Sequence, residues 1–313
     1  MPSRAPLPPA TRSPSQGAHE PDAVREVALP SPYDFDASMR FVPFGLHDPT
    51  SVLGEGVLWR SGRAPAGPVT VCLESVPAEP RVRASAWGPG ASWFLDRVEP
   101  MLGTSDDPAR FAPPPGPVAT LARRGGGLHL VRVPWVFDTV TQFVLQQRVS
   151  FRDAARAWGR LVRARRDEAP GPPGLLLPLA PRDWLRLSSE DFRRAGVDGQ
   201  RAGRLRAAAR HATIVDSAFA RERAAARDAL SRVPGCGPWT VEMVMGFGLG
   251  DADAVPTGDL HLPSLVAHAL AGEPQTDDTR MLALLEPYRG HRFRLIRLLL
   301  ASDRIRLGRS GRR

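Results

Sequence analysis

The stretch LSRVPGCGPWTVEMVMG, residues 230–246 of this 313-residue chain, restricts the fold more than any other part of the sequence. A helix that leads into it must end before Pro234, because proline and glycine cannot continue a helix. Gly235 and Gly237 allow positive φ and leave room for a close neighbour. Pro238 suits the first position of a new helix, where its missing N–H costs nothing. The pattern therefore predicts a helix, a tight hairpin and a second helix.

The predicted hairpin exposes unpaired N–H groups at a positive helix end, which is a surface suited to phosphate. Such a surface contacts the DNA backbone and does not read bases. The alternative interpretation is an ordinary joint between two helices that ends in a glycine cap. The segment VPTGDLHL, residues 255–262, then places Asp259 directly behind a Pro-Thr-Gly turn. Taken alone, Asp259 is also explained as the cap of the helix that follows.

The combination of VPGCGPWT with PTGDLHL resembles the signature of the helix–hairpin–helix (HhH-GPD) DNA glycosylase superfamily. Within it, the sequence is most similar to the bacterial 3-methyladenine DNA glycosylase II, or AlkA-type, branch. The similarity extends from about Tyr33 to Leu300. It implies a mainly α fold, in which a small α+β, TATA-binding-protein-like domain precedes the helical glycosylase domain. It also implies base excision repair, in which the enzyme flips a damaged base out of double-stranded DNA.

By this resemblance Asp259 is the catalytic carboxylate. Cleavage of an N-glycosidic bond develops positive charge on the sugar, and a fixed carboxylate stabilises that charge and helps to activate a water molecule. Bifunctional members place a lysine just after the hairpin, where this chain has Trp239, and the sequence contains no lysine. A lysine Schiff base is therefore excluded. We expect a monofunctional hydrolase that leaves an abasic site and has no lysine-dependent AP lyase activity.

The segment FVLQQRVSFRD predicts a turn between two helices. Ser150 and Asp153 form a capping-box pattern, so one helix ends near Gln147 and Arg148 lies on an exposed turn. In the resembled family this turn enters the minor groove and fills the gap left by the flipped nucleotide. The AlkA-type branch has leucine there, so Arg148 departs from the pattern, and a solvated arginine is the alternative. Gln147 matches a family glutamine that contacts DNA or braces the turn. The hairpin residues expected to contact DNA are Gly235, Gly237, Pro238 and Thr240.

The base pocket is less well determined by the sequence. Aromatic faces attract a cationic alkylated base, and the resemblance places Trp239, Met243, Leu260 and Tyr288 around it. Trp239 is shared with the branch and Tyr288 aligns with a pocket tryptophan. Met243 and Leu260 replace tyrosines, and Met243 is otherwise an ordinary core residue. An alkylated purine is the predicted substrate, with uracil or an oxidised base, or a non-catalytic DNA-binding or damage-sensing protein, as alternatives.

The charge balance favours a polyanionic partner. The formal net charge is +9 and the pI about 11, and all 42 basic residues are arginine, against 33 acidic residues. An excess of this kind is typical of proteins that bind nucleic acid, although a bias to arginine is also typical of a GC-rich genome. The charge therefore agrees with double-stranded DNA as the partner.

The remaining composition excludes several classes of protein. Hydrophobic residues make up 42% and charged residues 24% of the chain, as in globular proteins, and no apolar run approaches the roughly 18 residues of a membrane span. The first residues lack the apolar core of a secretion signal. Two cysteines are too few for an iron–sulfur cluster or a four-cysteine zinc site. We expect a cytoplasmic, nucleoid-associated monomer with no side-chain metal site. The resemblance adds only a monovalent cation on the hairpin backbone carbonyls.

Composition and periodicity divide the chain into four parts: a disordered Pro-rich leader (1–32), a small α+β domain (33–127), an all-α domain (128–302) and a basic tail (303–313). In the second part, GVLWRS, VTVCLES and RVRASAW are strand-like, and SWFLDRVEPMLG predicts a helix that ends at Gly103. In the third part, helices are predicted over 135–147, 150–164, 189–195, 199–212, 217–232, 238–248, 262–271 and 279–301.

Overall fold

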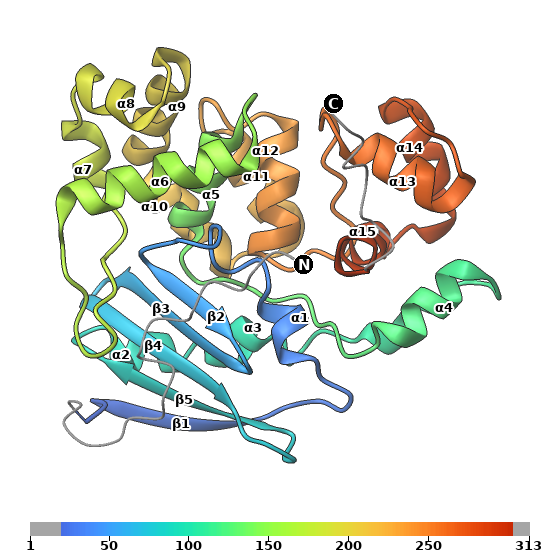
Figure 1. Ribbon diagram of the computed structural model, residues 1–313, viewed down its shortest axis with the longest axis horizontal. Helices are drawn as coiled ribbons and strands as arrows, with labels where there is room; N and C mark the ends of the chain where they lie inside the picture. The colour runs from blue at the N-terminus through green and yellow to red at the C-terminus, as the bar shows by residue number, and fades with distance from the viewer. Residues whose placement is uncertain (1–19, 303–313) are drawn as a thin grey trace, which may run out of the picture.

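The computed structural model describes residues 20–302, so the first part of the predicted leader and the basic tail lie outside the described residues. It combines one antiparallel sheet, in the order β1-β5-β4-β3-β2, with a larger helical region. Figure 1 shows the sheet below the group of helices α5–α12, with α13–α15 and α4 to one side. No helix in this described range is long and apolar enough to cross a bilayer. The predicted fold class, an α+β domain followed by a helical one, is confirmed.

The sheet is built from the three predicted strands and two further ones. Its strands are β1 (Ala23–Ala28), β2 (Ser51–Gly54), β3 (Val57–Ala64), β4 (Gly67–Ser75) and β5 (Arg81–Trp87). In β5, Val82, Ala84 and Ala86 are fully buried and alternate with more exposed residues, which is the period of a strand with one face on a core. The prediction of disorder through residue 32 is wrong for β1, which pairs along its whole length with β5. The sequence of β1 is polar and is flanked by prolines, so it shows no strand pattern of its own. The strand is stabilised by its pairing with the backbone of β5.

The helices follow in chain order, and most have the predicted position. They are α1 (Phe35–Met39), α2 (Ala91–Leu95), α3 (Val98–Leu102), α4 (Pro117–Arg124), α5 (Val136–Gln146), α6 (Phe151–Arg165), α7 (Pro181–Arg186), α8 (Ser189–Ala195), α9 (Gly199–Arg210), α10 (Ala212–Ser217), α11 (Arg223–Ser231), α12 (Pro238–Met243), α13 (Leu262–Ala271), α14 (Asp278–Leu285) and α15 (Arg292–Ala301). Short 3₁₀ segments are η2 (Pro108–Arg110), η3 (Ala218–Ala220) and η5 (Glu286–Tyr288), and η4 (Val244–Gly248) is a π-helical continuation of α12.

Three predicted helices are broken in the structure. The helix expected over 279–301 is interrupted by Pro287 and by Gly290, whose φ is +89°, because proline removes a backbone donor and a positive φ leaves the helical region. The helix expected over 217–232 divides into shorter segments before α11. The helix expected to end at Gly103 ends there, with φ +66°, but divides into α2 and α3.

Two large hydrophobic cores lie side by side, and a small third one contains Trp59, Cys72, Trp87 and Leu175. The first joins the sheet to α2 and α3, and the second fills the helical region from Leu128 onward and also takes in Phe44 and Phe111. Leu128 and Leu130 pack in the second core, whereas Val131, Val133 and Trp135 pack in the first. The predicted boundary at residue 127 therefore falls next to a segment that both cores share, and the domain limits stay a prediction. Helix α5 follows this segment directly and leads to the site.

Candidate functional site

The hairpin between α11 and α12 has the predicted shape. The N–H of Cys236 donates to the carbonyl of Val233 at 3.0 Å and closes the turn. Gly235 has φ +93°, and a Cβ there would lie 2.6 Å from Cγ of Arg204, so the fold itself requires glycine. Gly237 differs: its φ is −72° and a Cβ would meet nothing within 4 Å. The expected positive φ is therefore right for Gly235 and wrong for Gly237, where only an external partner would need the space.

Asp259 is held by three neutral donors. Its Oδ2 accepts a hydrogen bond from Nε1 of Trp239 at 2.8 Å, and its Oδ1 accepts from the N–H groups of His261 and Leu262, each at 2.8 Å. The carboxylate therefore binds the start of α13, as the capping interpretation expects, and its catalytic role stays a prediction. A carboxylate has about four acceptor positions, so one remains for a reacting group. The three donors carry no formal charge, so none of them forms an ion pair with the carboxylate.

The loop that carries Asp259 is fixed to its surroundings on both sides. Val255 donates its N–H to Oε2 of Glu242 on α12 at 3.2 Å, and Gly258 donates to Oδ2 of Asp278 at 2.7 Å. Arg227 on α11 donates to Glu242, and this hydrogen bond is the main reason that the pKa of Arg227 is raised. The two hairpin helices and the aspartate loop are thus joined by one charged network.

The turn between α5 and α6 lies against the hairpin through Gln147. Its Nε2 donates to the carbonyl of Gly235 at 3.0 Å and to Oγ1 of Thr240 at 2.8 Å, and its Oε1 accepts from Arg204 at 2.6 Å. Both amide hydrogens are therefore used within the protein, which supports the bracing role of Gln147. Arg148 is exposed at the tip of the turn in the left-handed region, with φ +62°. The predicted cap of α6 is present, since Ser150 accepts from the N–H of Asp153 at 3.1 Å.

The structure describes the surroundings of three further predicted contact residues. The side chain of Thr240 is 1% exposed and its hydroxyl is bound to Gln147, so this side chain does not reach DNA. Leu260 is 84% exposed. Tyr288 packs edge-on against Phe111, with the ring centroids 6.1 Å apart. The pocket roles of Leu260 and Tyr288 stay predictions.

A cavity of about 830 Å³ has Phe143 of α5 in its wall. Its walls include one predicted pocket residue, Met243, and five phenylalanines that the pocket assignment missed. These are Phe41, Phe44, Phe143, Phe151 and Phe247. Phe143 also meets the ring of Trp239 edge-on, with centroids 6.1 Å apart, so Phe143 and Trp239 connect the cavity to the carboxylate. Phe41 and Phe44 come from the loop RFVPFGL, and two aromatic residues in a proline- and glycine-containing loop are the only sequence signal for them.

Arg297 lies directly behind two of these walls. Its guanidinium carbon is 4.6 Å from the ring centroid of Phe41 and 5.4 Å from that of Phe247. The side chain is 1% exposed, donates to the carbonyl of Ala37 at 3.3 Å, and forms no ion pair with any residue in the range 20–302. Burial lowers the pKa of the guanidinium, which nevertheless stays protonated at neutral pH. The rear of the cavity is therefore positive.

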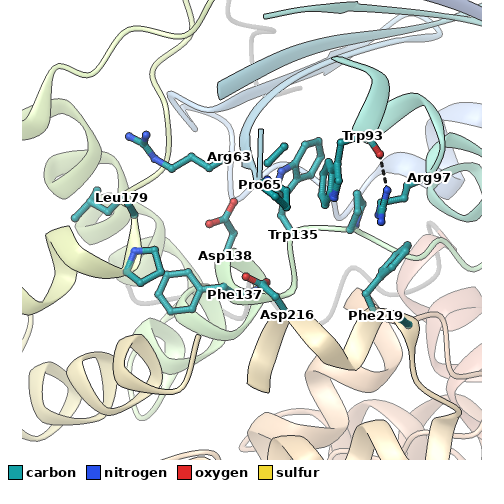
Figure 2. Close-up of a pocket in the computed structure, with 15 residues that line it drawn as sticks. Arg63, Pro65, Trp93, Arg97, Trp135, Phe137, Asp138, Leu179, Asp216 and Phe219 are labelled. Atoms are coloured by element: carbon teal, nitrogen blue, oxygen red, sulfur yellow. Dashed lines mark hydrogen bonds between the residues drawn. The ribbon is translucent and has the colours of Figure 1, made fainter. Parts of the chain in front are cut away.

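A second cavity, of about 410 Å³, lies between the sheet domain and α5 and contains no predicted site residue. Figure 2 shows Trp93 and Trp135 on one side of it and the carboxylates of Asp138 and Asp216 near each other on the other. Asp138 is 3.4 Å from Nη2 of Arg60 and so links α5 to β3. Burial raises the pKa of Asp138 to about 7, against a smaller lowering by Arg60.

The hairpin carbonyls are the groups that would hold the expected monovalent cation. Those of Val233 and Gly235 accept hydrogen bonds from Cys236 and Gln147, but each keeps a second lone pair. These two carbonyl oxygens therefore fit a monovalent cation as ligands, and the presence of the cation stays a prediction. Within residues 20–302, no group of three or more histidine, cysteine, aspartate or glutamate side chains is arranged to hold a metal ion.

Several solved structures share this fold. The 3-methyladenine DNA glycosylase from Archaeoglobus fulgidus matches with a TM-score of 0.72 and 20% identity, over 88% of this chain and 97% of that one. MBOgg1, in complex with a low-affinity DNA ligand, matches with a TM-score of 0.64 and 16% identity, over 90% and 96%. The Clostridium acetobutylicum 8-oxoguanine glycosylase/lyase, in complex with double-stranded DNA, matches with a TM-score of 0.64 and 12% identity, over 90% and 97%.

No family model matches the chain, and no curated protein matches its sequence. The structural matches nevertheless cover nearly the full length of both partners, so they include the sheet, the helical region and the hairpin. The resemblance predicted from residues 230–262 is therefore confirmed for the fold. The chain has the two-domain fold of the helix–hairpin–helix DNA glycosylases.

Proposed function

We propose that this chain is a monofunctional DNA glycosylase of the AlkA type, which removes an alkylated purine from duplex DNA. The observation that carries the proposal is the carboxylate of Asp259, held at 2.8 Å by Trp239, His261 and Leu262 and joined to the hairpin loop. A catalytic carboxylate must be fixed in position, and these three donors hold both of its oxygens. The fold shared with DNA glycosylases supports the same proposal.

In the proposed mechanism the hairpin binds the DNA backbone. The exposed N–H groups at Gly237 and the start of α12 contact a phosphate, and a cation on the carbonyls of Val233 and Gly235 would add positive charge there. Arg148 enters the duplex at the tip of its turn and takes the place of the flipped nucleotide. The base enters the cavity next to Phe143, which brings its sugar towards Asp259.

The bond between the base nitrogen and C1′ then breaks, and its electron pair leaves with the base. Asp259 stabilises the positive sugar that results. A water molecule adds to C1′ and loses a proton to the carboxylate or to the departing base, and an abasic site remains. Water is the proposed nucleophile because the 313-residue sequence has no lysine and Trp239 stands in the position after the hairpin.

The aromatic walls support an alkylated purine as the substrate. A cationic base is attracted to the faces of aromatic rings, and Phe41, Phe44, Phe143 and Phe247 supply such rings where the sequence comparison found too few. The fold neighbour with the highest of the three similarities is a 3-methyladenine DNA glycosylase, and this also supports the proposal.

A second candidate substrate is a neutral base with carbonyl groups, such as an oxidised purine or uracil. Arg297 favours it, because a buried guanidinium without a carboxylate partner repels a cationic base and attracts carbonyl oxygens. One of the other two fold neighbours is named as an 8-oxoguanine glycosylase/lyase.

The test is base release from duplexes that contain methylated purines, uracil or an oxidised purine, with and without alkali treatment of the products. We expect the wild-type chain to release one class of base, and strand breaks to appear only after alkali. Asp259→Asn should release base at least about 100-fold more slowly with DNA binding intact. Asp228→Asn, an exposed carboxylate on α11, is the matched control. No release from any duplex, with DNA binding intact, would instead support a non-catalytic DNA-binding protein.

A further inference from the structure

A third cavity, of about 720 Å³, lies at the far end of α11 from the hairpin. It is formed by the loop around residues 103–110, by residues 130–132, by the start of α11 and by residues 290–294. Helix α11 has nine residues, and its part of the cavity lining reaches only to Ala226, so about five residues, or roughly 7 Å of helix axis, separate the lining from the hairpin end of α11. The hairpin residues that would bind a duplex are therefore not among the residues that line this cavity.

The cavity carries uncompensated positive charge. Its lining includes five arginines and three carboxylates, which leaves two positive charges in excess. Arg110 and Arg294 pair with Asp107 and Asp106. The other three arginines form no ion pair with any residue that the structure describes. They are Arg132, Arg221 and Arg223.

The side chains of these arginines are bound only by neutral acceptors, where they are bound at all. Arg132 donates to the carbonyl of Phe219 at 2.6 Å, and Arg221 donates to the hydroxyl of Ser217 at 3.1 Å. Arg221 and Arg223 are exposed. Neutral acceptors satisfy hydrogen bonds but leave the charge in place, so an anion in this cavity would gain attraction from all three guanidinium groups.

The start of α11 adds to the same field. Its N-cap is Glu222, whose side chain makes no capping hydrogen bond, and Arg223 and Ala224 of the first turn line the cavity. The first N–H groups of a helix have no partner within the helix, and the helix dipole places partial positive charge there. A phosphate is the group that such a helix end binds most readily.

A buried arginine in the cavity wall points to the same ligand independently. Arg294 is 2% exposed, and although its Nη2 pairs with Asp106, its Nε and Nη1 have no partner among residues 20–302. The positive field also acts on its neighbours. Burial is the main reason that the pKa values of Arg132 and His291 are lowered. The charge of Arg223 lowers the pKa of Arg132 further, and the charge of Arg294 lowers the pKa of His291 further. A bound anion would relieve this repulsion.

We propose that this cavity is a binding site for a phosphate monoester dianion, separate from the DNA surface of the hairpin. Two positive charges in excess match the two charges of such a group, which forms charge-assisted bidentate hydrogen bonds with arginine. The phosphate is carried either by a small metabolite or by the terminal phosphate of an interrupted DNA strand. The site stands on its own contacts and does not depend on the proposed glycosylase activity.

The test is titration calorimetry with inorganic phosphate in a chloride buffer of constant ionic strength. We expect the wild-type chain to bind one phosphate, and Arg221→Gln/Arg223→Gln to bind it at least about tenfold more weakly. Both arginines are exposed, so this variant keeps the fold. Arg182→Gln/Arg186→Gln on α7 removes the same charge from exposed positions outside the cavity and should bind phosphate as the wild type does.

A second arm distinguishes the two sources of phosphate. The affinity for a nicked duplex with a 5′-phosphate is compared with that for the same duplex with a 5′-hydroxyl. A preference for the phosphate that Arg221→Gln/Arg223→Gln abolishes would identify a strand end as the ligand, and equal affinity would identify a small metabolite. Absence of phosphate binding by the wild type, or equal loss in the α7 control, would overturn the proposal.

Discussion

The corner around Asp259 and the cavity beside it serve one proposed reaction but are assembled in different ways. The corner is local, because the hairpin, Trp239 and Asp259 all lie within residues 230–262. The cavity collects its aromatic walls from the loop at 40–48, from α5, from the start of α6 and from η4, which are spread along the chain. The comparison shows that a catalytic group can be encoded by one continuous stretch while the surface that selects its substrate depends on how two domains pack.

The strongest test of the local corner is Trp239→Phe. This change removes the Nε1 donor to Asp259 and keeps an aromatic ring against Phe143. We expect kcat for base release to fall about 10-fold to 100-fold, because a fixed charge loses part of its orientation, while the Kd for duplex DNA stays the same. Single-turnover kinetics with a binding titration measure both. An unchanged kcat would show that the backbone donors of His261 and Leu262 hold the carboxylate alone.

The matching test of the cavity is Phe41→Ala. Phe41 is 38% exposed and belongs to the sheet domain, so the change affects the wall more than the core. We expect kcat/KM for a duplex with the damaged base to fall about tenfold, since stacking of a base on an aromatic ring contributes about 1–3 kcal/mol. Ile214→Ala, which removes an exposed apolar side chain from α10, is the control. Equal losses of kcat/KM in the two variants would show that the cavity does not bind the damaged base.

The two hairpin glycines are expected to have different roles: Gly235 is needed for stability, and Gly237 is needed for DNA binding. Gly235→Ala should lower the free energy of unfolding by roughly 1–3 kcal/mol, because of its positive φ and the contact with Arg204. Gly237→Ala should change it by less than about 1 kcal/mol but weaken binding of undamaged duplex. Urea unfolding and fluorescence anisotropy measure the two effects. A stable Gly237→Ala variant with full DNA affinity would remove the hairpin from the proposed interface.

The smallest expected effect is the pH dependence of stability that Asp138, in the wall of the 410 Å³ cavity, produces. The folded-state pKa of Asp138, about 7, lies above the ordinary value of 3.8. The stability that the neutral carboxyl contributes is therefore present below about pH 4 and is lost as the pH rises to about 7 and above. Between pH 6 and 7.5 the wild type should lose about 1 kcal/mol relative to Asp138→Asn. Urea unfolding of both proteins at the two pH values measures this difference, and parallel curves would contradict it.

The same contrast explains what the sequence could predict. The turn at Gly235, the start of α12 at Pro238 and the cap at Ser150 depend on neighbours within a few residues, and glycine, proline and capping side chains act over that range. Strand β1 depends on the backbone of β5, and the burial of Thr240 depends on Gln147 from another helix. No local pattern carries such contacts, and the five phenylalanines of the cavity were missed for the same reason.

Gln147 joins the turn that carries Arg148 to the hairpin loop, through Gly235 and Thr240. The spacing between the two points that meet the duplex is therefore set by the protein before DNA arrives. Under the proposed function, DNA must bend or unstack to fit this spacing, and sequences that deform easily would pay a smaller deformation energy. A lesion that weakens base stacking would lower the energy needed to deform the DNA. The enzyme would then bind such a site preferentially before the damaged base enters the cavity.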